Sequence, residues 1–402
     1  MTSEWHEVPL RELVGYISKG IAPSYAEEAS ETTIRVLNQK CNRNFRISYG
    51  DSRLHDTLKK KVPPERYVKP DDILINSTGA GTAGRIAQIE DVPSATTIDG
   101  HMILIRSNGK VTQKFLGYAL KAHQWEVLQL DEGSTGQTEL NRDRLLDEIM
   151  INYPVSFDEQ NAIVGTLESI DRKLIVNKEI NDNLEQQAQA IYHERFETAS
   201  PDDLHSGWRT VTLGEVATIL NKSFNPLKEP EMLLEHYSIP AFDEARFPVF
   251  DLSTSIKSNK FIIDASCFMI SKLNPTTKRV WKPYCLTGNA VCSTEFIVYK
   301  AKDKTITDFL YSVIDSNSFS DFMCSHVTGS TGSRQRTTPS DTLSYELILP
   351  SEDDLAEFQS LVSPMYAQIR INAIENDRLK RLRDSLLPKL MSGEIDVSAV
   401  QF

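Results

Sequence analysis

The sequence lacks the features that would place the protein in a membrane or outside the cell. No run of 18 or more apolar residues occurs, and the start, MTSEWHEVPLREL, has no basic stretch followed by an apolar one. We therefore expect neither a transmembrane helix nor a signal peptide. The five cysteines are odd in number and never form a C-x-x-C pattern, so we interpret them as reduced packing residues of a cytoplasmic protein.

Signatures of catalysis are missing as well. The ATP-binding pattern G-x-x-x-x-G-K-[Ser/Thr] is absent, and none of the eight histidines stands in an H-x-x-x-H pattern. The nearest match to the [Asn/Asp]-Pro-Pro-aromatic loop of an adenine methyltransferase is Asn274-Pro275-Thr276-Thr277, which lacks the second proline and the aromatic residue. We therefore expect this chain to be no enzyme and to hold no cofactor and no metal ion.

The charge balance points in two directions. A chain of 402 residues, 40% hydrophobic and 25% charged, is typical of a folded protein with two or more domains. The formal net charge of −12 argues against a free-standing nucleic-acid binder, whose contact surface should be basic. Residues 266–340, however, carry nine Lys and Arg against five Asp and Glu, so a local basic surface remains open.

The two halves of the chain are related in sequence, with offsets near 195 residues in the middle. The segment "DDILINS" matches "SCFMISK" at 266–272, and "TIDGHMILIR" at 97–106 matches "CSTEFIVYK" at 292–300. "GSTG" occurs at 133–136 and again at 329–332, and each copy ends in a β-like run and a proline. These matches indicate a tandem duplication.

A G-x-G-x-x-G pattern at Gly79, Gly81 and Gly84 follows an apolar run in the first copy. A dinucleotide site needs such glycines at a strand-to-helix turn. The following "RIAQIE" alternates like a strand, and the matching loop of the second copy, "KLNPTTKRVW", has no glycine. We therefore interpret the pattern as a variable loop on a repeated scaffold rather than a nucleotide site.

A heptad pattern follows the proline of each copy. The apolar and amide positions recur with 4-3-4-3 spacing, and the second series repeats the first at an offset of 195. Such spacing predicts a coiled-coil seam. The seam positions are Ile163, Leu167, Ile170, Leu174, Asn177, Leu184, Val362, Met365, Ile369, Asn372, Leu379 and Leu386.

Two helices of about 40 residues, roughly 60 Å each, are expected to pair antiparallel. Their midpoints, Asn177 and Asn372, would then meet and fix the register; the alternative is that both are exposed where the helices splay. Pro364 is expected to kink or delay the second helix, and Pro388 to end it. The first seam is roughly 42 Å long, the same order as the ~34 Å turn of DNA.

The whole chain resembles the specificity (S) subunit of type I restriction–modification systems. The resemblance is strongest in "P-x-x-x-x-E-Q-x-x-I", formed by Pro154, Glu159, Gln160 and Ile163, and in the tail "LLPKLMSGEI". "GSTG" shortly before each strand and proline is also usual in that family. The second helix departs from the pattern, because "SEDDLAEFQSLVSPMY" lacks the E-Q pair.

The resemblance implies a bacterial or archaeal DNA-binding subunit. Each globular unit would be a target-recognition domain that reads one half of a bipartite site, and the helices would set the gap. Two methyltransferase (M) subunits would bind this chain and use S-adenosylmethionine. Restriction (R) subunits, if present, would use ATP with Mg. The alternative is a coiled-coil scaffold that joins two protein-binding modules without DNA recognition.

The fold class predicted is α+β, with two tandem-duplicated α/β-type target-recognition domains joined by two long helices in an antiparallel, pseudo-twofold coiled coil. The segments expected are recognition domain 1 at 1–153, the first spacer helix at 154–200, recognition domain 2 at 201–350, and the second spacer helix with the C-terminal tail at 351–402.

Two loop regions in each copy are rich in the side chains that contact bases and phosphates. In the first copy these are Asn76, Thr78, Thr82, Arg85, Ser134, Thr135, Gln137 and Thr138. In the second copy they are Lys272, Asn274, Thr277, Lys278, Arg279, Ser330, Thr331, Arg334, Gln335 and Arg336. Arg334, Gln335 and Arg336 are the strongest candidates, since three long donors stand in a row.

Overall fold

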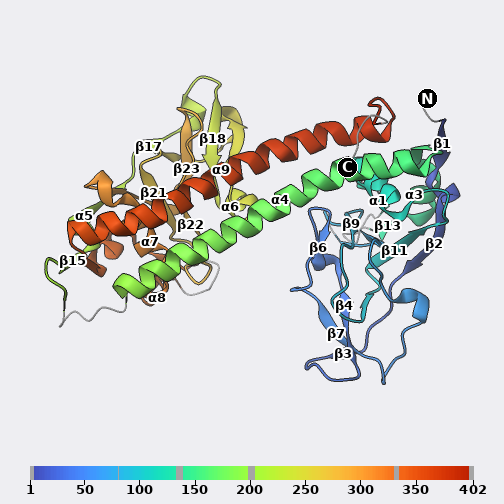
Figure 1. The fold of residues 1–402 in the computed structure, drawn as a ribbon, viewed down its shortest axis with the longest axis horizontal. Helices are drawn as coiled ribbons and strands as arrows, with labels where there is room; N and C mark the ends of the chain where they lie inside the picture. The colour runs from blue at the N-terminus through green and yellow to red at the C-terminus, as the bar shows by residue number, and fades with distance from the viewer. Residues whose placement is uncertain (1–3, 80, 133–138, 198–203, 330–334, 398–402) are drawn as a thin grey trace. The chain divides into compact units, whose positions relative to one another are not determined.

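The computed structural model describes residues 4–79, 81–132, 139–197, 204–329 and 335–397 (Figure 1). Contacts within the chain divide it into two compact units. Unit 1 comprises Met1–Lys173 and Leu379–Phe402, and unit 2 comprises Leu174–Arg378. Each unit contains a portion of both long helices. In the four-segment division expected from the sequence, each long helix is instead a separate segment. That division stays a prediction.

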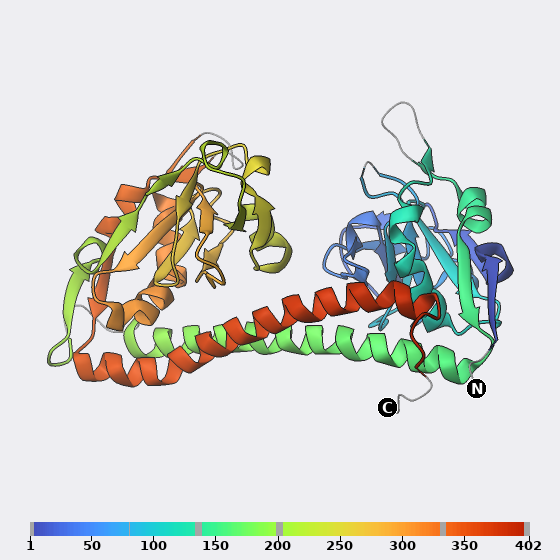
Figure 2. The same ribbon diagram turned by 90° about the horizontal axis from the view of Figure 1, so that it is seen from above.

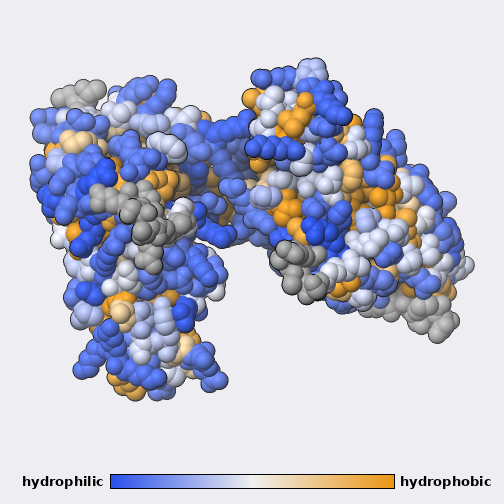
Figure 3. Space-filling view, turned by 180° about the vertical axis from the view of Figure 1, so that it is seen from behind, coloured by the Kyte–Doolittle hydropathy of each residue, from blue (hydrophilic) through white to orange (hydrophobic). Residues whose placement is uncertain are grey.

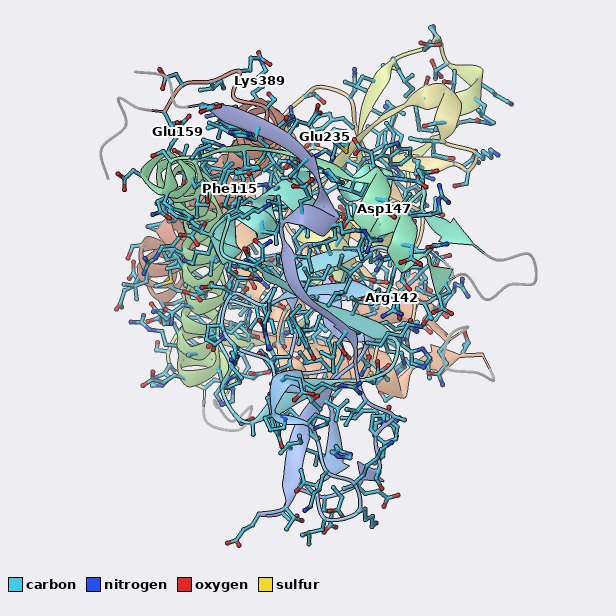
Figure 4. The ribbon with its side chains drawn as sticks, turned by 90° about the vertical axis from the view of Figure 1, so that its right-hand side faces the viewer. Phe115, Arg142, Asp147, Glu159, Glu235 and Lys389 are labelled. Atoms are coloured by element: carbon cyan, nitrogen blue, oxygen red, sulfur yellow. The ribbon has the colours of Figure 1, made fainter. Side chains whose placement is uncertain are left out.

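Unit 1 is built on an antiparallel sheet in the order β2-β11-β8-β9. Its strands are β2 (Val14–Lys19), β11 (Met102–Ser107), β8 (Ile73–Asn76) and β9 (Ile86–Gln88). Because successive side chains of a strand point to opposite faces, Ile73 and Ile75 face one core and Leu74 faces another. Phe115 of helix α1 (Gln113–Ala122), labelled in Figure 4, is fully buried in the first of these cores.

A second sheet of unit 1 has the order β10-β4-β7-β3. Its strands are β10 (Thr96–Ile98), β4 (Thr33–Leu37), β7 (Arg53–Asp56) and β3 (Tyr25–Ala26), and only β10 and β4 run parallel. Strand β1 (Trp5–Pro9) pairs antiparallel with β14 (Met150–Pro154). The strand and proline expected at the end of the first copy are therefore confirmed.

Unit 2 repeats this plan. Its first sheet has the order β16-β24-β21-β22, formed by β16 (Ala217–Leu220), β24 (Phe296–Ala301), β21 (Cys267–Ser271) and β22 (Val280–Trp281). Its second sheet has the order β17-β20-β23-β18-β19, formed by β17 (Ser223–Phe224), β20 (Lys260–Ile262), β23 (Ala290–Ser293), β18 (Leu233–Tyr237) and β19 (Val249–Leu252). Strand β15 (Arg209–Thr212) pairs with β27 (Glu346–Leu349) as β1 pairs with β14. The tandem duplication is confirmed.

Shorter elements connect these sheets. The helices are α2 (Gln124–Val127), α3 (Arg142–Glu148), α5 (Leu213–Val216), α6 (Ile239–Ala245), α7 (Thr307–Ile314) and α8 (Asn317–Ser325). The strands are β5 (Asn42–Arg43), β6 (Arg46–Ile47), β12 (Asp131–Glu132), β13 (Glu139–Leu140), β25 (Val327–Thr328) and β26 (Arg336–Thr337). Within the described ranges, no helix has the length and apolar character needed to cross a membrane.

The long helices α4 (Phe157–Tyr192) and α9 (Glu352–Met391) pair antiparallel within each unit (Figure 2). In unit 2, Asn177 of α4 donates a hydrogen bond to Asn376 of α9 at 2.9 Å. In unit 1, Arg383 of α9 contacts Asp171 of α4 at 2.9 Å. Residue numbers thus fall along α9 as they rise along α4, which confirms the antiparallel prediction.

The expected direct pairing of Asn177 with Asn372 is wrong by about one helical turn. Asn177 bonds to Asn376, while Asn372 donates to Asn181 at 2.8 Å. Asn177 and Asn372 are 0% and 4% exposed, so the alternative of exposed asparagines is also wrong. Four amides instead form two adjacent polar layers, because the heptad period sets the inward face of each helix and not the axial offset between helices.

The prolines neither delay nor end the second helix. Helix α9 begins at Glu352, continues through Pro364 and Pro388, and ends at Met391. A proline inside a helix removes one backbone hydrogen bond. Phe358 and Val362 before Pro364, and Tyr366 after it, are all buried in one core cluster of unit 2, which holds the helix on both sides of the missing bond.

Every predicted seam residue is buried or half-buried. The seam has more than one partner, however. Ile163 and Leu167 pack into the core of unit 1 with Phe115, and Val362 packs into the core of unit 2. The outer parts of the seam are therefore covered by the globular cores, and the polar layers lie between α4 and α9.

Candidate nucleic-acid interface

The glycine-rich segment of unit 1 lies in a hairpin loop between the antiparallel strands β8 and β9. Gly79, Gly81 and Gly84 all have positive φ, and a Cβ on Gly84 would lie 2.9 Å from the Val127 carbonyl oxygen. The glycines therefore serve turn geometry and close packing. Among the described residues of this loop, 77–79 and 81–85, no helix begins, so they offer no helix N-terminus of the kind that holds pyrophosphate in a dinucleotide site.

In unit 1 the first predicted loop region lies beside strand β13, which directly follows the second one. The Leu140 amide donates to the Ser77 carbonyl at 2.8 Å, and Thr78 lies opposite Glu139 in an isolated antiparallel bridge. The Ser77 amide in turn donates to the His101 carbonyl at 2.8 Å. Strand β13 is thereby joined to the β8–β9 loop.

Unit 2 has the same arrangement. The Thr337 amide donates to the Lys272 carbonyl at 3.1 Å, and Leu273 lies opposite Arg336 in an isolated antiparallel bridge. The Lys272 amide donates to the Glu295 carbonyl at 2.9 Å. In each unit we call these two connected segments the loop pair. In unit 1 it consists of the loop after β8 and strand β13, and in unit 2 of the loop after β21 and strand β26.

The described candidates in unit 1 have different environments. Asn76 is fully buried; its amide donates to the Gln39 carbonyl at 3.2 Å and accepts from Asn42 at 3.2 Å. This side chain anchors the loop and cannot meet a base edge, so we correct the expectation that it contacts DNA. Thr78, Thr82 and Arg85 are half-buried on the loop itself.

The loop side chains of unit 1 are oriented by local bonds. Thr78 Oγ1 lies 2.8 Å from His101 Nδ1, and Arg85 donates to the Gly81 carbonyl at 3.1 Å. Helix α3, on which Figure 4 labels Arg142 and Asp147, follows β13. Four candidates lie outside the described residues: Ser134, Thr135, Gln137 and Thr138.

Several basic candidates of unit 2 are held by carboxylates. Lys278 pairs with Asp315 at 3.0 Å, and Arg279 forms a two-pronged pair with Asp243 at 2.5 and 2.9 Å. Arg279 is only 13% exposed, so it braces the loop more than it presents a donor. Asp243 lies outside residues 266–340, so it was not included when the basic and acidic residues of that segment were counted. Its pairing with Arg279 therefore cancels part of the positive charge counted there.

The other candidates of unit 2 belong to the loop pair. Asn274 has a φ of +50° and donates its backbone amide to the Gln335 carbonyl at 2.9 Å, while its side chain donates to Thr277 at 3.2 Å. Lys272, Asn274 and Gln335 are half-buried, and Thr277 is exposed. Three candidates lie outside the described residues: Ser330, Thr331 and Arg334.

Arg336 is fixed by Glu295. Its Nε and Nη2 donate to the two carboxylate oxygens at 3.0 and 3.2 Å, and the hydrogen bond from Arg336 to Glu295 raises the pKa of the guanidinium. Lys300 and Asp264 form a second ion pair of this unit. Burial opposes ionisation of Asp264, but hydrogen bonds from Ser266 and Lys300 outweigh it and lower the pKa of this carboxyl to about 2. Carboxylates thus set the direction of several basic side chains of this unit.

Sequence reasoning missed four residues of the loop pairs: Lys19, His101, Glu139 and Glu295. Lys19 forms an ion pair with Glu139 across unit 1. The repeat alignment held a usable signal, since "DGHM" and "STEF" place His101 and Glu295 at the same position. No sequence pattern connects Lys19 to Glu139, because they are 120 residues apart.

The described residues of these loops carry mainly hydroxyl, amide and charged side chains. Hydrophilic residues dominate the face of unit 1 seen in Figure 3, and unit 2 mixes hydrophilic with apolar residues there. The exposed apolar side chains Leu233 and Leu252 of unit 2 lie on β18 and β19. The chemistry that the loop pairs offer is hydrogen bonding and charge recognition.

Comparison with known proteins identifies the same plan elsewhere. Residues 2–186 match the type I restriction modification DNA specificity domain family. The MjaIX type I restriction enzyme specificity subunit of Methanocaldococcus jannaschii is 25% identical over 381 residues, covering 87% of this chain and 83% of the relative. The HindI specificity subunit of Haemophilus influenzae is 33% identical over 93 residues, covering 23% of this chain and 20% of that protein.

A solved structure supports the fold. The S subunit of a type I restriction-modification system from M. genitalium has 16% sequence identity and a TM-score of 0.59, covering 97% of this chain and 96% of that chain. Residues 2–186 thus match the DNA specificity domain family, and 87% of the chain is similar in sequence to a type I restriction enzyme specificity subunit.

Proposed function

We propose that this chain is the sequence-specific DNA-binding subunit of a type I restriction–modification complex in the cytoplasm of a bacterium or archaeon. Each unit reads one half of a bipartite site through its loop pair. The observation that carries this assignment is the repetition of the loop pair: bridges at Thr78–Glu139 and at Leu273–Arg336 place polar loops on equivalent backbones. Two equivalent surfaces suit a target with two half-sites.

In this proposal the chain performs no chemistry. Two methyltransferase subunits, which use S-adenosylmethionine, bind it and methylate adenine; restriction subunits with ATP and Mg add cleavage where they are present. The scaffold alternative, in which the units bind only proteins, draws support only from the net charge of −12.

The helices α4 and α9 set the gap between half-sites in this proposal. Seven residues inserted into α4 alone, after Asn177, separate Asn177 from Asn181, so the helices cannot keep both the Asn177–Asn376 bond and the Asn372–Asn181 bond. A matching insertion after Asn372 restores the pairing on a longer frame. The double insertion adds about 10 Å at 1.5 Å per residue, so we expect a gap about three base pairs longer and unchanged half-sites.

The decisive experiment maps N6-methyladenine on DNA exposed to the full chain together with the methyltransferase of the same system. Methylation at two short sequences with a constant gap supports the proposal. A stable complex that leaves DNA unmethylated, and that selects no sequence from a duplex library, favours the scaffold alternative. A double insertion that alters a half-site instead of the gap contradicts the role given to the helices.

A further inference from the structure

Glu139 of unit 1 and Arg336 of unit 2 occupy the same position of the repeated fold. Met102 pairs with Asn76 in unit 1 as Phe296 pairs with Ser271 in unit 2. Two residues beyond each central strand, Thr78 lies opposite Glu139 and Leu273 lies opposite Arg336. The same backbone position therefore carries a carboxylate in one unit and a guanidinium in the other.

The hairpins that carry these residues agree as well. Glu139 lies opposite Glu132 in the β12–β13 pair, and Arg336 lies opposite Thr328 in the β25–β26 pair. The next residue in each hairpin, Leu140 or Thr337, donates its backbone amide to the first residue after β8 or β21. The opposite charges thus stand on backbones that are bonded alike on both sides.

Each of the two side chains has a charged partner at the rim of its sheet. Glu295 holds Arg336 through Nε and Nη2. Glu139 is paired with Lys19 at the end of β2. Arg336 remains 42% exposed and Glu139 53% exposed, so each is oriented and still accessible.

The residue beside each bridge also differs between the units. His101 occupies in unit 1 the position that Glu295 occupies in unit 2, since each accepts a backbone bond from the residue after the central strand. His101 bonds to Thr78 and not to Glu139. The charged partner of the side chain at this position therefore differs between the units. Glu295, which pairs with Arg336, lies in the turn before β24, whereas Lys19, which pairs with Glu139, lies at the end of β2.

We propose that this shared position determines half-site specificity, with opposite chemistry in the two units; the inference rests on the DNA-recognition function proposed above. Arg336 donates to a base edge that presents acceptors, for which guanine O6 and N7 are the best match. Glu139 accepts from a base edge that presents an amino group, for which cytosine N4 is the best match. Glu295 and Lys19 act as positioning residues.

The test uses the full chain in complex with its methyltransferase subunits and a duplex library randomised at both half-sites, with bound DNA sequenced. We expect Arg336→Gln to lower the preference for guanine at one position of one half-site by about tenfold or more. We expect Glu139→Gln to lower the preference for cytosine at one position of the other half-site. Lys304→Ala and Glu28→Gln, which make the same charge changes at exposed sites, should leave both half-sites unchanged.

Two further variants distinguish direct contact between Arg336 and a base from the positioning of Arg336 and from an effect on folding. Arg336→Lys keeps the charge but loses the two-pronged geometry, so we expect an intermediate loss of preference with an unchanged thermal midpoint. Glu295→Gln weakens the same preference without affecting the other half-site. These outcomes distinguish a reading role from a general loss of structure.

The failures are distinguishable. If the wild-type complex selects no split site, the proposed DNA function is wrong. If the wild type selects a split site and Arg336→Gln leaves both halves unchanged, the assignment of this position is wrong while the function stands. The same holds if Arg336→Gln and Glu139→Gln alter the same half-site.

Discussion

Asn372 of α9 donates a hydrogen bond to Asn181 of α4 at 2.8 Å, and it accepts one from Gln368 of its own helix at 2.7 Å. This contact and the Asn177–Asn376 bond form two adjacent polar layers between otherwise apolar seam positions. A polar layer of this kind fixes the register of a coiled coil at some cost in stability.

Replacing Asn372 by alanine should lower the free energy of unfolding by about 1–3 kcal/mol, because it leaves the half-buried Asn181 without this partner between the helices. Urea denaturation of the full chain measures the change. Gln187→Ala is the matched control, since Gln187 is exposed and bonds to Asn183 of the same helix. Equal losses in the two variants would show that the layer contributes nothing specific.

A buried group of charges in unit 1 predicts a dependence on pH. Burial opposes ionisation of Asp171, but Lys121 at 3.0 Å and Arg383 at 2.9 Å outweigh it and keep the pKa of the carboxyl below its ordinary value. A carboxyl with a lowered pKa stabilises the fold above its unfolded-state value of about 3.9 and loses that contribution as the pH falls through the folded-state value.

Asp171→Asn should therefore lower the free energy of unfolding by about 3 kcal/mol at neutral pH. The difference from the wild type should shrink as the pH falls below about 4. Urea denaturation at pH 7 and pH 3 tests both statements, with the exposed Glu179→Gln on the same helix as control. A difference that stays constant over this range would contradict the electrostatic account.

Two basic residues of unit 2 should affect DNA binding differently. Lys272 stands at the bridge of the loop pair, so Lys272→Ala should weaken binding to all sequences and reduce the slope of log K against log salt by about 0.9. Arg279 is committed to Asp243, so Arg279→Ala should lower stability and leave the slope unchanged. Affinity titrations between about 50 and 200 mM salt measure the slope; the reverse pattern would exchange the two roles.

Exchange of the first recognition unit with that of a relative should need two segments. Leu387, Leu390, Met391 and Val397 lie in the core of unit 1, although they come from the end of the described chain. A swap of residues 1–153 alone should lower the thermal midpoint, and including residues 379–397 should restore it. With both segments exchanged, one half-site should change and the gap should not. Selection from a duplex library detects this, and a change in both halves would refute the modular arrangement.

Periodicity and internal repetition made much of the fold predictable. The apolar runs at Ile73 and Cys267 became equivalent central strands, and the 4-3-4-3 spacing identified the helix faces that meet. The glycine-rich loop could be set aside because its sequence context is that of a hairpin. These features depend on local geometry, which a sequence expresses directly.

The side-chain environments of the interface could not be read in this way. The burial of Asn76, the pairing of Arg279 with Asp243 and the contact between Lys19 and Glu139 depend on which strands become neighbours. Partner choice for a charged residue has no period and no fixed spacing. The composition of the sequence therefore located the loops. It could not distinguish side chains that are bonded within the protein from side chains that are exposed for contact with DNA.

The end of α9 has a consequence for the order in which the protein is completed. Unit 2 is one continuous stretch, Leu174–Arg378, whereas unit 1 also needs the segment in which Gly393 lies so close to the Trp5 ring that a Cβ there would be 2.9 Å from it. A ribosome synthesises the chain from its N-terminus. The first residues of unit 1 are therefore made before unit 2, but the core of unit 1 is completed after it. A nascent or truncated copy keeps the interior of unit 1 open to water and to proteases until the final turns of α9 arrive.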